Sequence, residues 1–210
     1  MPPSDPDFFL GEVRQLNSTI RAGGPEALPA FHKLTNLILN ITVVAPGNAL
    51  KLIKLTQDPT KAALGGRSAR EPLRLNDGRY LRISARLYLD RASQPNFLKV
   101  EETGFQYQLD PEGSRWIFRY DYLRNPPHAY PASHLQPNGQ LGEAHAFPDL
   151  PLKKIHLPTG RVSIEAVIRL LVEQFKVPSN NPPEVWRRVL TESERDFLKV
   201  AHQALSGPES

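Results

Sequence analysis

YLRISARLYLD, residues 80–90, is the stretch of sequence that decides the fold. Its side chains alternate between apolar and polar with the period of two that is typical of a β-strand. One face would carry Leu81, Ile83, Ala85, Leu87 and Leu89, and the other Tyr80, Arg82, Ser84, Arg86 and Tyr88. The pattern predicts a strand whose apolar face covers a core and whose polar face is open to solvent.

Two more strands follow closely along the chain. Residues 97–109 and 115–123 are rich in aromatic and branched side chains, and an Asp-Pro-Glu-Gly turn signal separates them. Over residues 97–109 the apolar side chains switch from the even-numbered to the odd-numbered positions near Gly104, which predicts a bulge there. Strands joined by short turns predict an antiparallel meander, and shorter strands within 128–136 and 152–157 would bring it to four or five strands.

Helical periodicity marks both ends of the chain. Apolar residues recur at helical spacing over 7–21 and 26–41, and residues 48–54 are expected to form a third helix. After the sheet, Ser163 is expected to cap a helix, and Thr191-Glu-Ser-Glu194 has the form of a capping box that starts a last one. The expected fold class is therefore α+β, an antiparallel β-meander flanked by N-terminal and C-terminal helices.

The loop signals between the first helices and the sheet predict a domain boundary. Residues 58–78 contain two prolines, a Gly-Gly pair and an Asn-Asp-Gly turn, which is the composition of a hinge. The expected organisation is an N-terminal helical region (1–66), a core domain of antiparallel sheet plus helix (67–178) and a C-terminal helical segment (179–210).

The composition limits the chemistry. The chain has no cysteine, which excludes a disulfide framework, a thiolate metal site and a cysteine nucleophile. Its net charge is +4, and seven arginines lie between Arg67 and Arg91 against three acidic residues. This balance is compatible with nucleic acid as a partner.

No stretch of the sequence predicts a membrane span or a leader. The apolar-rich stretch 34–55 is interrupted by asparagine, proline and lysine, and the N-terminus lacks the basic and apolar regions of a signal peptide. We expect a soluble, cytoplasmic protein that does not bind a membrane.

The polar face of the strand at 80–90 is the first candidate site. Arg82 and Arg86 would contact phosphates while Tyr88 stacks on a base, as in proteins that bind single-stranded RNA or DNA. The alternative is a solvated sheet face whose arginines pair with Glu101, Glu102 or Glu112.

The second candidate is the Tyr-, Arg- and His-rich stretch from Arg115 to Arg161. Imidazoles titrate near neutral pH, so His128 and His134 are candidates for proton transfer, and Asp121 would orient a histidine or a guanidinium. Arg119 and Arg161 would hold a phosphate, with Tyr120 and Tyr122 stacking beside them. The alternative is structural, with Arg119 and Asp121 as a surface ion pair and the histidines as hydrogen-bonding loop residues.

Metal binding is the weakest candidate. The spacing of His128, His134, His145 and His156 matches no standard zinc pattern, and no acidic residue stands at a helical i+4 position to any of them. We expect no metal ion and no cofactor. The turn at 157–161 precedes a helix, and we interpret it as a capped turn rather than a phosphate-binding loop.

Part of the chain resembles a known group of proteins. The run Arg119-Tyr-Asp-Tyr122, then Pro126-Pro-His128 and Ser133-His134-Leu-Gln136, is similar to a pattern in an uncharacterised bacterial protein family. More distantly it resembles TumE-like toxins of toxin–antitoxin systems, although Ser133 and Gln136 stand where that pattern would have histidine. With Ile155–Ile168, the likeness covers roughly residues 79–176. The resemblance implies an RNA-directed, toxin-like protein with a cognate antitoxin or another protein partner.

The sequence therefore supports two functions. The first is a toxin-like RNA-binding protein that acts as a metal-independent ribonuclease, with Asp121, His128 and His134 in catalytic roles. Its substrate-binding residues would be Arg82, Arg86, Tyr88, Arg119, Tyr120, Tyr122 and Arg161. The second is a non-catalytic protein-interaction module.

Overall fold

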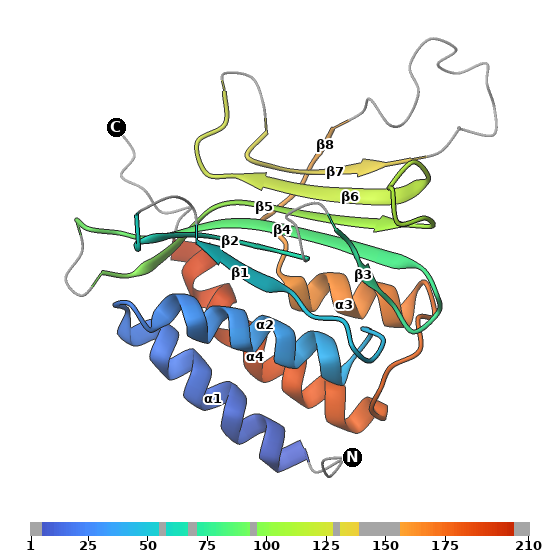
Figure 1. Ribbon diagram of the computed structural model, residues 1–210, viewed down its shortest axis with the longest axis horizontal. Coiled ribbons are helices and arrows are strands. Elements are labelled where there is room, and N and C mark those ends of the chain that lie inside the picture. Colours follow the sequence, from blue (N-terminus) through green and yellow to red (C-terminus); the bar gives the residue numbers. More distant parts are fainter. Residues whose placement is uncertain are drawn as a thin grey trace.

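The computed structural model describes residues 6–54, 58–66, 71–92, 96–127, 131–138 and 156–203. They form one antiparallel sheet with four helices gathered on one of its faces (Figure 1). The expected α+β class is confirmed, and the sheet has eight strands rather than four or five. None of the helices in the described ranges combines the length and the apolar character that crossing a bilayer requires.

The elements follow one another as a meander with helices at both ends. The helices are α1 (Pro6–Ala22), α2 (Ala27–Ile41), α3 (Ile164–Glu173) and α4 (Pro183–Gln203). The strands are β1 (Lys51–Lys54), β2 (Lys61–Gly65), β3 (Leu73–Arg74), β4 (Tyr80–Leu89), β5 (Leu98–Gln108), β6 (Trp116–Leu123), β7 (Ser133–Pro137) and β8 (Leu157–Pro158). Their order in the sheet is β1-β2-β4-β5-β6-β7-β8, and β3 also pairs with β4.

Strand β4 has the two faces that its sequence predicted. Its apolar side chains are all buried in the core that also includes the helices, while the polar ones alternate with them. The bulge, however, lies at Glu101 and not at Gly104, because Arg86 pairs with Glu102 and Leu87 pairs with Val100. Glu101 is exposed, and an unpaired charged side chain is readily tolerated there.

The predicted third helix is wrong. Residues Lys51–Lys54 form the edge strand β1, which pairs with β2, and β2 and β3 lie in the stretch predicted to be a loop. A helix of a few residues is costly to nucleate, whereas this backbone gains ladder hydrogen bonds at the sheet edge. The range 1–66 therefore supplies two strands of the main sheet, and Leu64 shares a core with Leu10 of α1.

The C-terminal helices are partly as predicted. Ser163 caps α3, since its Oγ accepts a hydrogen bond from the Ala166 amide at 3.0 Å. The capping box predicted at Thr191 is wrong, because α4 runs without interruption from Pro183 to Gln203. Val189 and Leu190 are fully buried, so the stripe of α4 that packs on the core continues through this point.

Polar side chains join α3 to α4 across a buried contact. Glu194 accepts hydrogen bonds from Ser163 Oγ at 2.5 Å and from the Arg169 guanidinium. Ser193 Oγ donates to Glu165 Oε1 at 2.5 Å, and the Glu165 residue is only 5% exposed. Burial raises the pKa of the Glu165 carboxyl, and the Ser193 hydrogen bond opposes that rise.

We expect Glu165→Gln to stabilise the protein at alkaline pH and to have little effect at acidic pH. Because the folded state holds this proton more tightly, the contribution of Glu165 to stability is full below its unfolded pKa and is lost as pH rises through its folded pKa. The loss amounts to about 1.4 kcal/mol per pH unit between those two values. Urea unfolding at pH 4, 6 and 8 measures it, and an equal effect at all three values would contradict the prediction.

Candidate functional site

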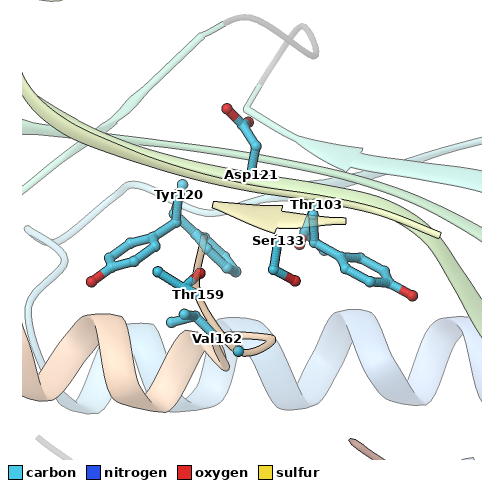
Figure 2. A pocket seen from close by; sticks show the side chains of 9 residues that line it. Thr103, Tyr120, Asp121, Ser133, Thr159 and Val162 are labelled. Carbon is cyan, nitrogen blue, oxygen red and sulfur yellow. The ribbon is translucent and has the colours of Figure 1, made fainter. Parts of the chain in front are cut away.

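The sheet face turned away from the helices is called the open face here. Register places Ser84 of β4 and Asp121 of β6 on either side of Gly104 of β5, and it places His134 of β7 beside Asp121. Figure 2 shows Asp121 projecting from β6 on the side opposite to Tyr120, whose side chain points toward the helices. Strand alternation therefore sends Arg119 and Asp121 to the open face, as the sequence predicted.

Asp121 is the centre of a polar cluster on this face. Arg119 Nε lies 2.6 Å from Asp121 Oδ2 and 2.9 Å from its Oδ1, so the guanidinium spans both carboxylate oxygens. On the other side, His134 Nε2 lies 3.6 Å from Asp121 Oδ2. The carboxylate therefore stands between a half-exposed arginine and an imidazole.

Two imidazoles pack against each other next to Asp121. The ring centroids of His134 and His156 are 4.6 Å apart, and the Gln136 amide nitrogen lies 3.0 Å from His156 Nε2. His134 is only 4% exposed, whereas His156 is partly exposed. Burial lowers the pKa of His134, the Asp121 carboxylate opposes that change, and His156 adds to it. His134 is therefore neutral at neutral pH.

The sequence indicated His156 only as one of four candidate metal ligands. The pairing of β7 with β8 brings His156 beside Gln136 and His134, although residues 139–155 separate them in the sequence. The signal in the sequence was the short apolar run before Arg161, which predicted a returning strand without indicating its partner. His128 lies outside the described residues.

Gly104 exposes bare backbone beside this cluster. A Cβ built there would lie 2.9 Å from Ser84 Oγ and 3.1 Å from Asp121 Oδ1. Ser84 makes no hydrogen bond through its side chain to any described residue. The hydroxyl and the carboxylate therefore stand on either side of backbone that only glycine leaves uncovered.

The turn between β5 and β6 folds over one end of the open face. Arg82 Nη2 donates to the Glu112 carbonyl at 3.1 Å, and Gln106 Nε2 donates to the buried Gln108 side chain at 2.8 Å. Gly113 lies against the same three side chains. Arg82, expected to bind substrate, thus holds this turn in place.

Arg86 and Tyr88 occupy the other end of the open face. Arg86 Nε lies 2.7 Å from Glu102 Oε1, which is one of the ion pairs that the structural alternative expected. Register places the partly exposed Tyr88 between Lys61 of β2 and Lys99 of β5. Tyr88 thus stays accessible, with a lysine on each side.

The structure separates Arg161, Tyr120 and Tyr122 from Arg119. The Arg161 guanidinium lies over the Tyr122 ring at 4.5 Å and over the Phe197 ring at 5.1 Å, on the helical side of the sheet. Burial lowers the pKa of Arg161. A joint phosphate clamp by Arg119 and Arg161 is therefore not the arrangement found. Alternation along β6 puts Arg119 on one face and Tyr122, which Arg161 contacts, on the other.

The tyrosines on that side help to line a small cavity. It lies between the sheet and the segment before α3 (Figure 2), and its wall includes Thr103, Tyr120, Tyr122, Ser133, Thr159 and Val162. Burial raises the pKa of Tyr120, so this phenol stays protonated at neutral pH. Tyr120 and Val162 of this wall also pack against the hydrophobic core.

The described ranges contain no group of three or more histidine, aspartate or glutamate side chains placed to hold a metal ion. No protein-family model, curated protein or solved structure matches the chain.

Proposed function

We propose that the chain binds RNA on the open face of its sheet and cleaves it without a metal ion. The observation that carries the proposal is the cluster of Arg119, Asp121, His134 and His156, in which two imidazoles lie 4.6 Å apart on the sheet face opposite to the four described helices. Imidazoles beside a guanidinium supply proton transfer and charge stabilisation, which are what phosphodiester cleavage requires.

The roles follow from exposure. His156, the more accessible imidazole, takes the proton of a ribose 2′-hydroxyl while the 2′-oxygen forms a bond to phosphorus. The bond from phosphorus to the 5′-oxygen breaks, and His156 returns the proton to that oxygen. Arg119 stabilises the negative charge that develops on the phosphate. His134 is a positioning residue, because it is buried between Asp121 and His156.

The resemblance to TumE-like toxins supports the same proposal. In such a pair the chain would be the RNA-directed member, acting in the cytoplasm, and a cognate antitoxin would be its protein partner. The basic balance of the chain, +4 overall, favours a polyanionic substrate.

One observation favours a non-catalytic protein-interaction module as the second candidate. Arg86 and Arg119 both sit in ion pairs with carboxylates, which reduces the charge that they offer to phosphate. A module of this kind would bind its partner and turn over no RNA, so a cleavage assay separates the two candidates.

The test is cleavage of RNA in the presence of EDTA by the wild type and by Asp121→Asn. We expect the wild type to cleave, and the variant to be slower by about tenfold to hundredfold because Arg119 and His134 lose their shared partner. The Asp121 charge raises the pKa of His134, so its removal should lower that pKa further and move the acidic limb of the rate profile to lower pH.

Two outcomes would contradict the proposal. One is a wild type that leaves RNA intact in EDTA while it binds a protein partner, which is the result expected of the interaction module. The other is an Asp121→Asn variant with an unchanged rate and pH profile. Arg14→Gln, on the exposed side of α1, is the control that should change neither.

A further inference from the structure

The bare backbone of Gly104 lies between two oxygens of different chemistry. Ser84 Oγ and Asp121 Oδ1 would both touch a Cβ at this position, at 2.9 and 3.1 Å. They belong to the strands on either side of β5, in one row of the sheet. A small group that approaches the bare backbone therefore meets both oxygens together.

The two oxygens accept only certain ligand groups. A serine hydroxyl donates or accepts a hydrogen bond, whereas an ionised carboxylate only accepts. A group that satisfies both must donate to Asp121, and it can either donate to Ser84 or accept from it. A phosphate oxygen cannot donate and is repelled by the carboxylate, but a hydroxyl meets both conditions.

We infer that Ser84, Gly104 and Asp121 form a site for the 2′-hydroxyl of a ribose other than the one that His156 deprotonates, so that the open face selects RNA over DNA. The inference rests on the proposed function and names its specificity determinant, since the 2′-hydroxyl is the group that distinguishes the two nucleic acids. Arg119 holds the Asp121 carboxylate in place through both of its oxygens. Glycine is required because a methyl group would occupy the space that the hydroxyl enters.

The test is the affinity of the full chain for three fluorescent oligonucleotides of one sequence, made of RNA, DNA and 2′-O-methyl RNA. Every chain tested carries His156→Gln, so that no RNA is consumed. Binding is measured by fluorescence anisotropy in EDTA. We expect RNA to bind about tenfold more tightly than DNA, the value of one hydrogen bond to a charged group. 2′-O-methyl RNA should bind like DNA, because its ether oxygen cannot donate to Asp121.

Two further variants test whether Ser84 and Gly104 cause the preference for RNA over DNA. Ser84→Ala and Gly104→Ala should each weaken RNA binding about fivefold or more and leave DNA binding unchanged. Gly104→Ala remains foldable because its closest contact is the Ser84 hydroxyl, which can rotate away, and the thermal midpoint checks this. Ser18→Ala and Gly11→Ala, both at exposed positions of α1, are the matched controls.

The outcomes separate the inference from the function beneath it. Equal binding of RNA and DNA, or an RNA preference that survives in both variants, overturns the 2′-hydroxyl site while RNA binding stands. A chain that binds none of the three oligonucleotides refutes the proposed function, and the inference with it.

Discussion

Replacing both His134 and His156 with glutamine is expected to reduce RNA cleavage in EDTA by about a thousandfold, the middle of the range for lost general acid–base catalysis. The two rings pack at 4.6 Å between centroids, and Gln136 and Asp121 orient them. Glutamine keeps a polar side chain of similar reach but cannot move a proton at neutral pH. Cleavage of a labelled oligonucleotide under single-turnover conditions measures the loss.

The single variants distinguish the two roles. His156→Gln should account for nearly the whole loss, whereas His134→Gln should be milder and should shift the acidic limb of the pH profile, since His134 acts through its neighbours. Both chains must unfold near the wild-type temperature for the comparison to hold. If the double variant cleaves RNA at the wild-type rate, the two imidazoles take no part in the reaction.

The sequence was most informative where local pattern and tertiary structure agree. Alternation over 80–90 predicted both faces of β4, and alternation from Arg119 to Tyr122 predicted which side chains share a face. The Ser163 cap was also predictable, because a helix start is a local event.

The errors arose where distant pairing decides the outcome. Lys51–Lys54 becomes a strand because β2 returns beside it, and His156 joins the cluster because β8 pairs with β7. No local pattern encodes such a partner. Arg161 was grouped with Arg119 because tyrosine, arginine and histidine are dense along this part of the chain. In the structure the two guanidinium groups lie on opposite faces of the sheet, Arg119 beside Asp121 and Arg161 over Tyr122.

Tyr107→Ala is expected to destabilise the protein by about 3–5 kcal/mol, the range for removal of a large buried side chain. Tyr107 is fully buried in β5, and its ring lies 5.1 Å from Phe175, just beyond α3, and 5.7 Å from Phe118 of β6. It therefore ties the helical layer to the strand that carries Gly104 on its other face. Chemical denaturation with urea measures the free energy of unfolding.

The phenol of Tyr107 makes a smaller, separable contribution. Arg79 donates to its oxygen at 2.5 Å, and the hydroxyl donates to Asp77 at 3.2 Å, while burial raises its pKa to about 12. Tyr107→Phe should therefore cost only about 1–2 kcal/mol, because the ring and its aromatic contacts remain. Tyr88→Ala, on the open face of β4, is the matched control and should cost less than about 1 kcal/mol. If Tyr107→Ala proves no more harmful than this control, the aromatic contact does not hold the sheet to the helices.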